Sequence, residues 1–187
     1  MNTAEAQDIL QMYVNDMLAL EQDTAKALAS QSEDEDVKKL PVSAVLVLDL
    51  AAAAQARVAA LDSLAKDLGG GVGKAVKDAL GSVAGVLAGL YAKVRKHPVS
   101  RMLRDDYTAL SLAVEGYSML HTTALALRDP RVAALAERHM TEITPHVMRL
   151  AQAIPAVVIS ELAEDFPGLE RSAADQGAAA NQAAWRQ

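Results

Sequence analysis

The sequence predicts an all-α protein in which four long helices pack as an antiparallel bundle. Hydrophobic residues make up 51% of the 187 residues, but aromatic residues only 3%. Because strands favour β-branched and aromatic side chains, this balance, together with abundant alanine, favours close-packed helices. The apolar spacing also follows the period of a helix from about residue 5 to residue 160. We expect residues 1–165 to form the bundle and residues 166–187 a flexible tail.

Charge and cysteine content exclude several functional classes. The net charge of −6 argues against general nucleic-acid binding, because proteins bind a phosphate backbone with clustered basic residues. The chain has no cysteine, which excludes disulfides, zinc–thiolate sites and iron–sulfur clusters. Residues 1–8 lack the pattern of a signal peptide, and no run of eighteen apolar residues is free of charge. These features predict a cytoplasmic protein with no transmembrane segment.

The first helix is predicted over residues 3–30, and a charged, solvated turn over residues 31–40. The apolar stripe of the helix consists of Leu10, Val14, Met17, Glu21 and Leu28. Glu21 therefore lies in the middle of an apolar face. A carboxylate in that position either has a partner or reaches solvent at the edge of the stripe.

The second helix is predicted over residues 41–68, with Pro41 in its first turn. Its stripe consists of Val47, Leu50, Ala54, Leu61, Ala65 and Leu68. Neither a carboxylate nor a histidine lies in that stripe. The glycine run at 69–71 ends the helix, and it lacks the Lys-Ser/Thr pair of a phosphate-binding loop.

A further helix is predicted over residues 74–96. Gly81, Gly85 and Gly89 recur at every fourth residue, a spacing that allows the backbones of two helices to approach closely. The segment is too short to span a membrane before its basic residues begin. A tight helix crossing within the chain, a subunit contact and an interfacial membrane helix all fit this pattern. With the alanine-rich surface, it leads us to expect a homodimer.

The third helix is predicted over residues 100–128. Its apolar face consists of Leu110, Ala113, Tyr117, Leu120, Ala124 and Leu127, with His121 at the flank. Asp129 and Pro130 make a short turn into the fourth helix. Helices joined by so short a turn are antiparallel neighbours.

The fourth helix carries the candidate functional residues in the stretch 132–157. Its stripe consists of Val132, Leu135, His139, Glu142, Ile143, His146, Leu150 and Val157. Two imidazoles and one carboxylate thus lie among residues that face a core. Such groups are either paired with each other or bound to a metal, because unpaired buried charges are costly. Pro145 and Pro155 should kink the helix or open its hydrogen-bond ladder.

Three stretches carry a resemblance to a known family. They are D-M-L-A-L-E-Q-D-T-A-K-A-L at 16–28, L-D-S-L-A-K-D-L-G at 61–69, and residues 117–150. In these stretches the chain resembles the stress-associated ferritin-like proteins of the YciE/YciF type. The resemblance implies an antiparallel ferritin-like four-helix bundle, with an extra helix inserted between helices two and three. It also implies kinship with rubrerythrin-like proteins, in which inward carboxylates and histidines from four helices hold two metals.

The ligand set that this resemblance implies is incomplete. The family's glutamates on helices one and four match Glu21 and Glu142. Its ligand positions on helices two and three fall at residues 51–54 and near Ala113, where this chain has alanine. A bridged di-iron centre needs about four carboxylates. The resemblance thus implies a stress-associated bundle with an incomplete di-metal site, no bound cofactor, and a structural or interaction role with an unidentified protein partner.

A single metal is the alternative. Glu21, Glu142 and His146, with His139 as a further ligand, offer carboxylate and imidazole donors that suit Fe, Mn or Zn. On this hypothesis the protein binds one metal ion or has a redox activity. Three of these four candidates, however, come from one helix.

Overall fold

The computed structural model describes residues 3–69 and 98–186, and its regular elements in those ranges are all α-helices. They are α1 (Thr3–Ser32), α2 (Glu35–Lys39), α3 (Pro41–Asp67), α5 (Pro98–Leu127), α6 (Pro130–Asp165) and α7 (Ala173–Ala184). The all-α prediction is confirmed. The helix expected at 74–96, with its spaced glycines, lies outside the described residues, as does the contact expected there.

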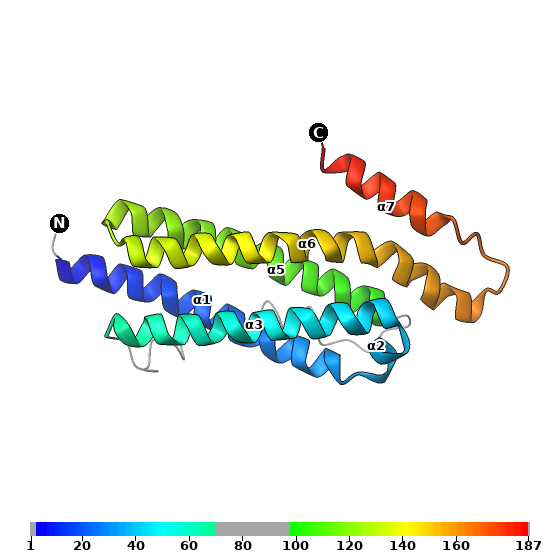
Figure 1. Ribbon diagram of the computed structural model, residues 1–187, viewed down its shortest axis with the longest axis horizontal. Coiled ribbons are helices and arrows are strands. Elements are labelled where there is room, and N and C mark those ends of the chain that lie inside the picture. The colour runs from blue at the N-terminus through cyan, green and yellow to red at the C-terminus, as the bar shows by residue number, and fades with distance from the viewer. Residues whose placement is uncertain (1–2, 70–97, 187) are drawn as a thin grey trace.

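The four long helices lie side by side (Figure 1). α1 packs against α3 and α5, and α6 packs against α5 and α3, so the cyclic order is α1, α3, α6, α5. Neighbours in this order run antiparallel, whereas α3 and α5 run in the same direction (Figure 1). One face of each long helix therefore lines the interior.

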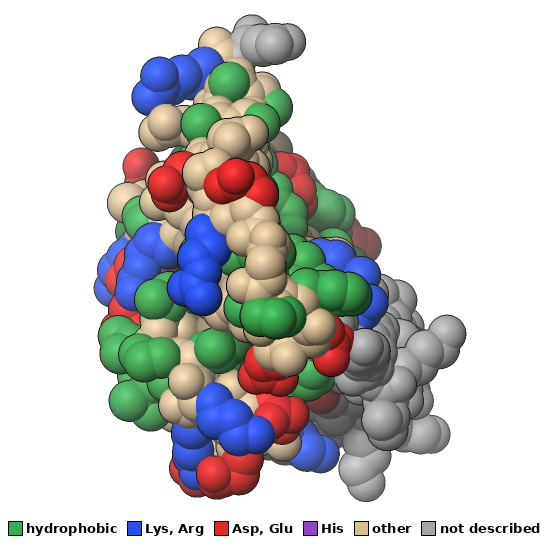
Figure 2. Space-filling model, turned by 90° about the vertical axis from the view of Figure 1, so that its right-hand side faces the viewer, with side chains coloured by type: hydrophobic (Ala, Val, Ile, Leu, Met, Phe, Trp, Pro, Cys, Tyr) green, Lys and Arg blue, Asp and Glu red, His purple; other side chains and the backbone are tan. Residues whose placement is uncertain are grey.

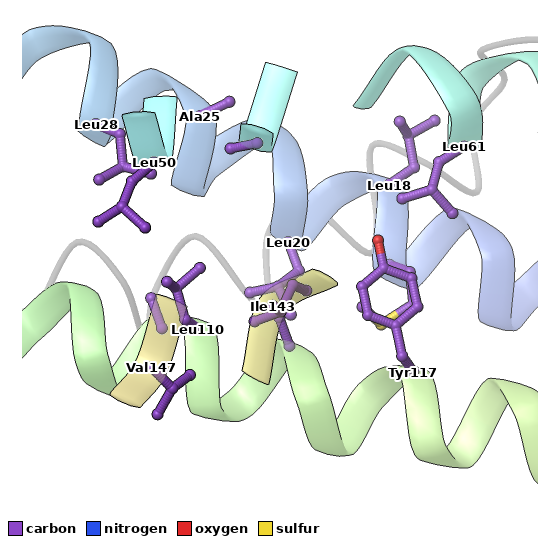
Figure 3. Close-up of a cluster of buried hydrophobic side chains, with 14 of the residues drawn as sticks. Leu18, Leu20, Ala25, Leu28, Leu50, Leu61, Leu110, Tyr117, Ile143 and Val147 are labelled. Atoms are coloured by element: carbon purple, nitrogen blue, oxygen red, sulfur yellow. The ribbon is translucent and has the colours of Figure 1, made fainter. Parts of the chain in front are cut away.

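The interior consists mainly of leucine, valine and alanine, including Leu18, Leu50, Leu110 and Val147 (Figure 3). Small residues let the helices approach one another. A Cβ atom added at Gly116 of α5 would lie 2.5 Å from the Met17 Sδ atom of α1. Burial of this aliphatic surface supplies the main free energy of folding.

The first turn of α5 is capped by a side chain from α6. The carboxylate of Glu161, which is buried, accepts hydrogen bonds from the backbone N–H groups of Val99 at 2.7 Å and Ser100 at 3.1 Å. These are donors that a helix cannot satisfy within itself. A negative charge at a helix N-terminus is also favourable to the helix dipole. Glu161 thus fastens the end of α6 to the start of α5.

Glu161→Ala is expected to lower the free energy of unfolding by about 2 kcal/mol, because two buried N–H groups lose their acceptor. Glu164→Ala, at an exposed position one turn away, is the matched control and should change it by less than about 0.5 kcal/mol. Urea unfolding followed by circular dichroism measures both. Equal losses in the two variants would contradict the capping role.

Helix α3 is apolar on its outer face as well as its inner one. Its outward side chains Val42, Val45 and Leu48 are exposed. Among the described helices, α3 alone is long and apolar enough to cross a membrane, a composition that also suits a core helix. In Figure 1, α3 and α6 lie on the side of the molecule nearest the viewer. This side is on the left of Figure 2, which shows hydrophobic side chains gathered there.

Residues 173–184, which the sequence predicted as part of a flexible tail, form helix α7. This helix packs on the outside of α6 (Figure 1). Its alanine-rich sequence favours a helix, although none of its residues is buried. Residues 173–184 therefore add a further helix on the outside of the bundle, where the sequence predicted a tail.

Candidate functional site

A deeply buried ion pair joins α1 and α3. The Glu21 side chain is 0% exposed and that of Arg57 is 3% exposed. Arg57 Nε donates to Glu21 Oε1 at 2.7 Å, and Arg57 Nη2 donates to Glu21 Oε2 at 3.0 Å. This two-point geometry matches the planar guanidinium to the carboxylate. The partner that Glu21 needs on its apolar face is therefore an arginine.

The other two long helices each add a polar ring beside this pair. Tyr117 of α5 donates its hydroxyl to Glu21 Oε1 at 3.1 Å. The ring of His139 of α6 lies edge-on to that of Tyr117, with 5.0 Å between the centroids. Figure 3 shows the Tyr117 ring pointing from α5 toward Leu18 and Leu61. We call Glu21, Arg57, Tyr117 and His139 the core polar cluster.

Burial sets the protonation states in the core polar cluster. Burial lowers the pKa of His139 to about 4, and the positive charges of Arg138 and Arg57 act in the same direction. Burial, and then the charge of Glu21, raise the pKa of Tyr117 well above its usual value. Both rings are therefore uncharged at neutral pH. The His139 Nδ1 atom is buried and has no hydrogen-bond partner among the described residues.

The predicted metal ligands do not converge. Glu21 and His139 are buried in the interior, as expected. Glu142, predicted to face inward, is exposed and lies 3.9 Å from Arg138 on the same surface. His146 is half-buried, and burial lowers its pKa. In residues 3–69 and 98–186, no three histidine or carboxylate side chains are grouped so as to hold a metal.

The error at Glu142 comes from where the apolar stripe of α6 is centred. Its buried residues are Val132, Ala133, Ala136, His139, Ile143, Val147, Leu150, Ala151, Val157 and Glu161. Glu142 precedes Ile143 and is rotated about 100° from it, which carries its side chain to the surface. The expected meeting of Glu21, Glu142 and His146 is therefore wrong in this structure.

Arg57 is the residue that the sequence interpretation missed. It lies three residues after Ala54 and four before Leu61, so it belongs to the buried stripe of α3. A helical wheel alone could have placed an arginine opposite the buried glutamate of the first helix. An inward carboxylate and an inward guanidinium on neighbouring helices predict an ion pair.

The arrangement limits the chemistry available at this site. Each oxygen of the Glu21 carboxylate already accepts a hydrogen bond from the guanidinium, and the charges of the pair cancel. The flanking rings are neutral, and the four side chains are all almost fully buried. Any packing that separates Glu21 from Arg57 would leave a buried charge without its partner, so the pair disfavours such packings.

Comparison with known proteins yields no relative for this chain: no protein-family model, curated protein or solved structure matches it.

Proposed function

We propose that the protein is a ferritin-like bundle in which the Glu21–Arg57 ion pair replaces the di-metal centre, leaving a structural or interaction role. The observation that carries this proposal is the two-point contact of the Arg57 guanidinium with the Glu21 carboxylate. A carboxylate in the centre of a bundle needs positive charge nearby. Metal ions supply it in di-iron bundles, and the Arg57 guanidinium supplies it here.

Helix order supports the ferritin-like part of the proposal. Two antiparallel pairs, α1 with α3 and α5 with α6, are arranged so that α3 and α5 run in the same direction (Figure 1). A bundle with one long crossover connection has this arrangement. The stress association and the cytoplasmic location are proposed from the sequence resemblance and the composition.

Side chains at the missing ligand positions support the loss of metal. The resemblance implies ligands within residues 51–54 and near Ala113, and the alanines there carry no donor atom; Ala54 and Ala113 are buried. The exposed Glu142 removes a further ligand from the interior. Only Glu21 and His139 of the candidate ligands remain inside. We therefore propose no oxidase or ferroxidase activity.

Metal analysis tests this proposal. Protein expressed in medium supplemented with Fe, Mn and Zn should contain well under one equivalent of any of them. Glu21→Gln, which keeps the shape of the side chain and removes its charge, is the control for metal held in the core. About one equivalent of metal in the wild type, lost in Glu21→Gln, would favour the mononuclear alternative instead.

A further inference from the structure

A proline in α6 leaves a backbone carbonyl without its helical hydrogen bond on the surface where α7 packs. Pro155 has no N–H group, so the carbonyl of Ala151, four residues earlier, lacks its usual helical donor. Asn181 of α7 fills this position, because its Nδ2 atom donates to the Ala151 oxygen at 3.0 Å. A buried carbonyl of a helix thus becomes a recognition point for another helix.

The contacting residues of this C-terminal segment lie on one stripe. Gly177, Asn181 and Trp185 are spaced by four, so they share one face of a helix. A Cβ atom at Gly177 would lie only 3.3 Å from that of Pro155, so the absence of a side chain permits close approach. The Trp185 ring meets the Tyr107 ring of α5 edge-on at 6.4 Å. The surface therefore selects a helix with a small residue, an amide and an aromatic residue at this spacing.

A second hydrogen bond fixes the orientation of the Asn181 side-chain amide. Trp185 Nε1 donates to Asn181 Oδ1 at 3.0 Å, which turns the Asn181 NH₂ group toward Ala151. Asn181 thereby joins the aromatic contact on α5 to the carbonyl on α6. Specificity of this kind comes from a few placed polar groups, not from buried area.

Few contacts hold α7 in place. None of its residues is buried, and Trp185 is 53% exposed. Residues 166–172, which include Pro167 and Gly168, connect it to α6. Phe166 in this connection is also exposed. Elements with so little buried surface detach at low free-energy cost.

We propose that this surface of α6 and α5 is a helix-binding site that takes α7 from a second copy of the chain, so that two chains associate by exchanging α7. An exchanged α7 remakes every contact that it leaves, because the second copy carries the same groove. The inference specifies the interaction role proposed above, but it does not depend on the absence of metal.

Disulfide cross-linking tests the exchange. Because the natural chain has no cysteine, only the introduced cysteines can form a disulfide. Gln152 of α6 and Ala178 of α7 line the same small cleft between these helices. Full-length Gln152→Cys and Ala178→Cys chains, mixed and oxidised, should form a disulfide between chains. Glu137→Cys, at an exposed position farther along α6, replaces Gln152→Cys in the control mixture and should give several-fold less product.

Two further variants sharpen the result. Adding Asn181→Ala to the Ala178→Cys chain should lower the cross-linked yield several-fold. Deletion of residues 167–171 shortens the connection and should force exchange, giving twice the mass of the chain by light scattering. Cross-linking no faster than in the control mixture, together with a monomeric deletion variant, would overturn the proposal. Metal content would be unaffected, so failure here is distinct from failure of the metal-free core.

Discussion

Arg57→Ala is expected to lower the free energy of unfolding by about 3–5 kcal/mol, because it leaves the Glu21 carboxylate buried without its counter-charge. For a chain of this size, that corresponds to a fall of roughly 10 °C in melting temperature. Urea unfolding and thermal melting followed by circular dichroism measure the two quantities. The same variant leaves Tyr117 as the only hydrogen-bond donor to Glu21 that the described contacts provide.

The matched control removes both charges. Glu21→Leu combined with Arg57→Met replaces the pair by apolar side chains of similar length and should recover most of the lost stability. The difference between the single and double variants measures the cost of an unpaired charge. If Arg57→Ala unfolds at the same urea concentration as the wild type, the pair does not stabilise the core.

His139 is expected to make stability fall with acid between about pH 6.5 and pH 4. Its pKa in the folded protein is about 4, below the 6.5 of the unfolded chain, because it is buried near Arg138 and Arg57. In that interval the unfolded chain binds a proton that the folded chain does not. The neutral ring therefore supports full stability above pH 6.5, and about 3 kcal/mol is lost by pH 4.

His139→Phe is the control for this pH dependence. Phenylalanine keeps an aromatic ring against Tyr117 and cannot titrate, so the free energy of unfolding should vary less with pH in this interval. Measuring both proteins by urea unfolding at pH 7, 6, 5 and 4 isolates the contribution of the imidazole. Parallel curves for the two proteins would show that other groups cause the acid sensitivity.

The helices were predictable because each long segment has a clear apolar period and a local start or stop signal. Asp129, for example, accepts hydrogen bonds from the N–H groups of Arg131 and Val132 and begins α6 where the sequence indicated. The inward position of Glu21 was predictable for the same reason. Local spacing decides which face of a helix is apolar.

What could not be predicted depends on contacts between distant segments. The capping of α5 by Glu161 joins residues about sixty positions apart, and no local pattern marks it. The docking of α7 depends on the Ala151 carbonyl, thirty residues before Asn181, which Pro155 leaves without a helical donor. Glu142 shows the opposite difficulty, since a residue at the edge of a stripe can face either way. The direction of the Glu142 side chain depends on how α6 packs against α5 and α3. That packing cannot be read from the sequence alone.

The most direct test of the ion pair as the replacement for a metal centre is the melting temperature with and without metal. Wild-type protein is melted in chelator and then with excess Fe(II), Mn(II) or Zn(II). We expect melting temperatures equal within about 1 °C, because the Glu21 carboxylate already binds Arg57. A specific site filled at a hundred times its dissociation constant would add about 2.7 kcal/mol. A rise of 5 °C or more that Glu21→Gln abolishes would contradict the account.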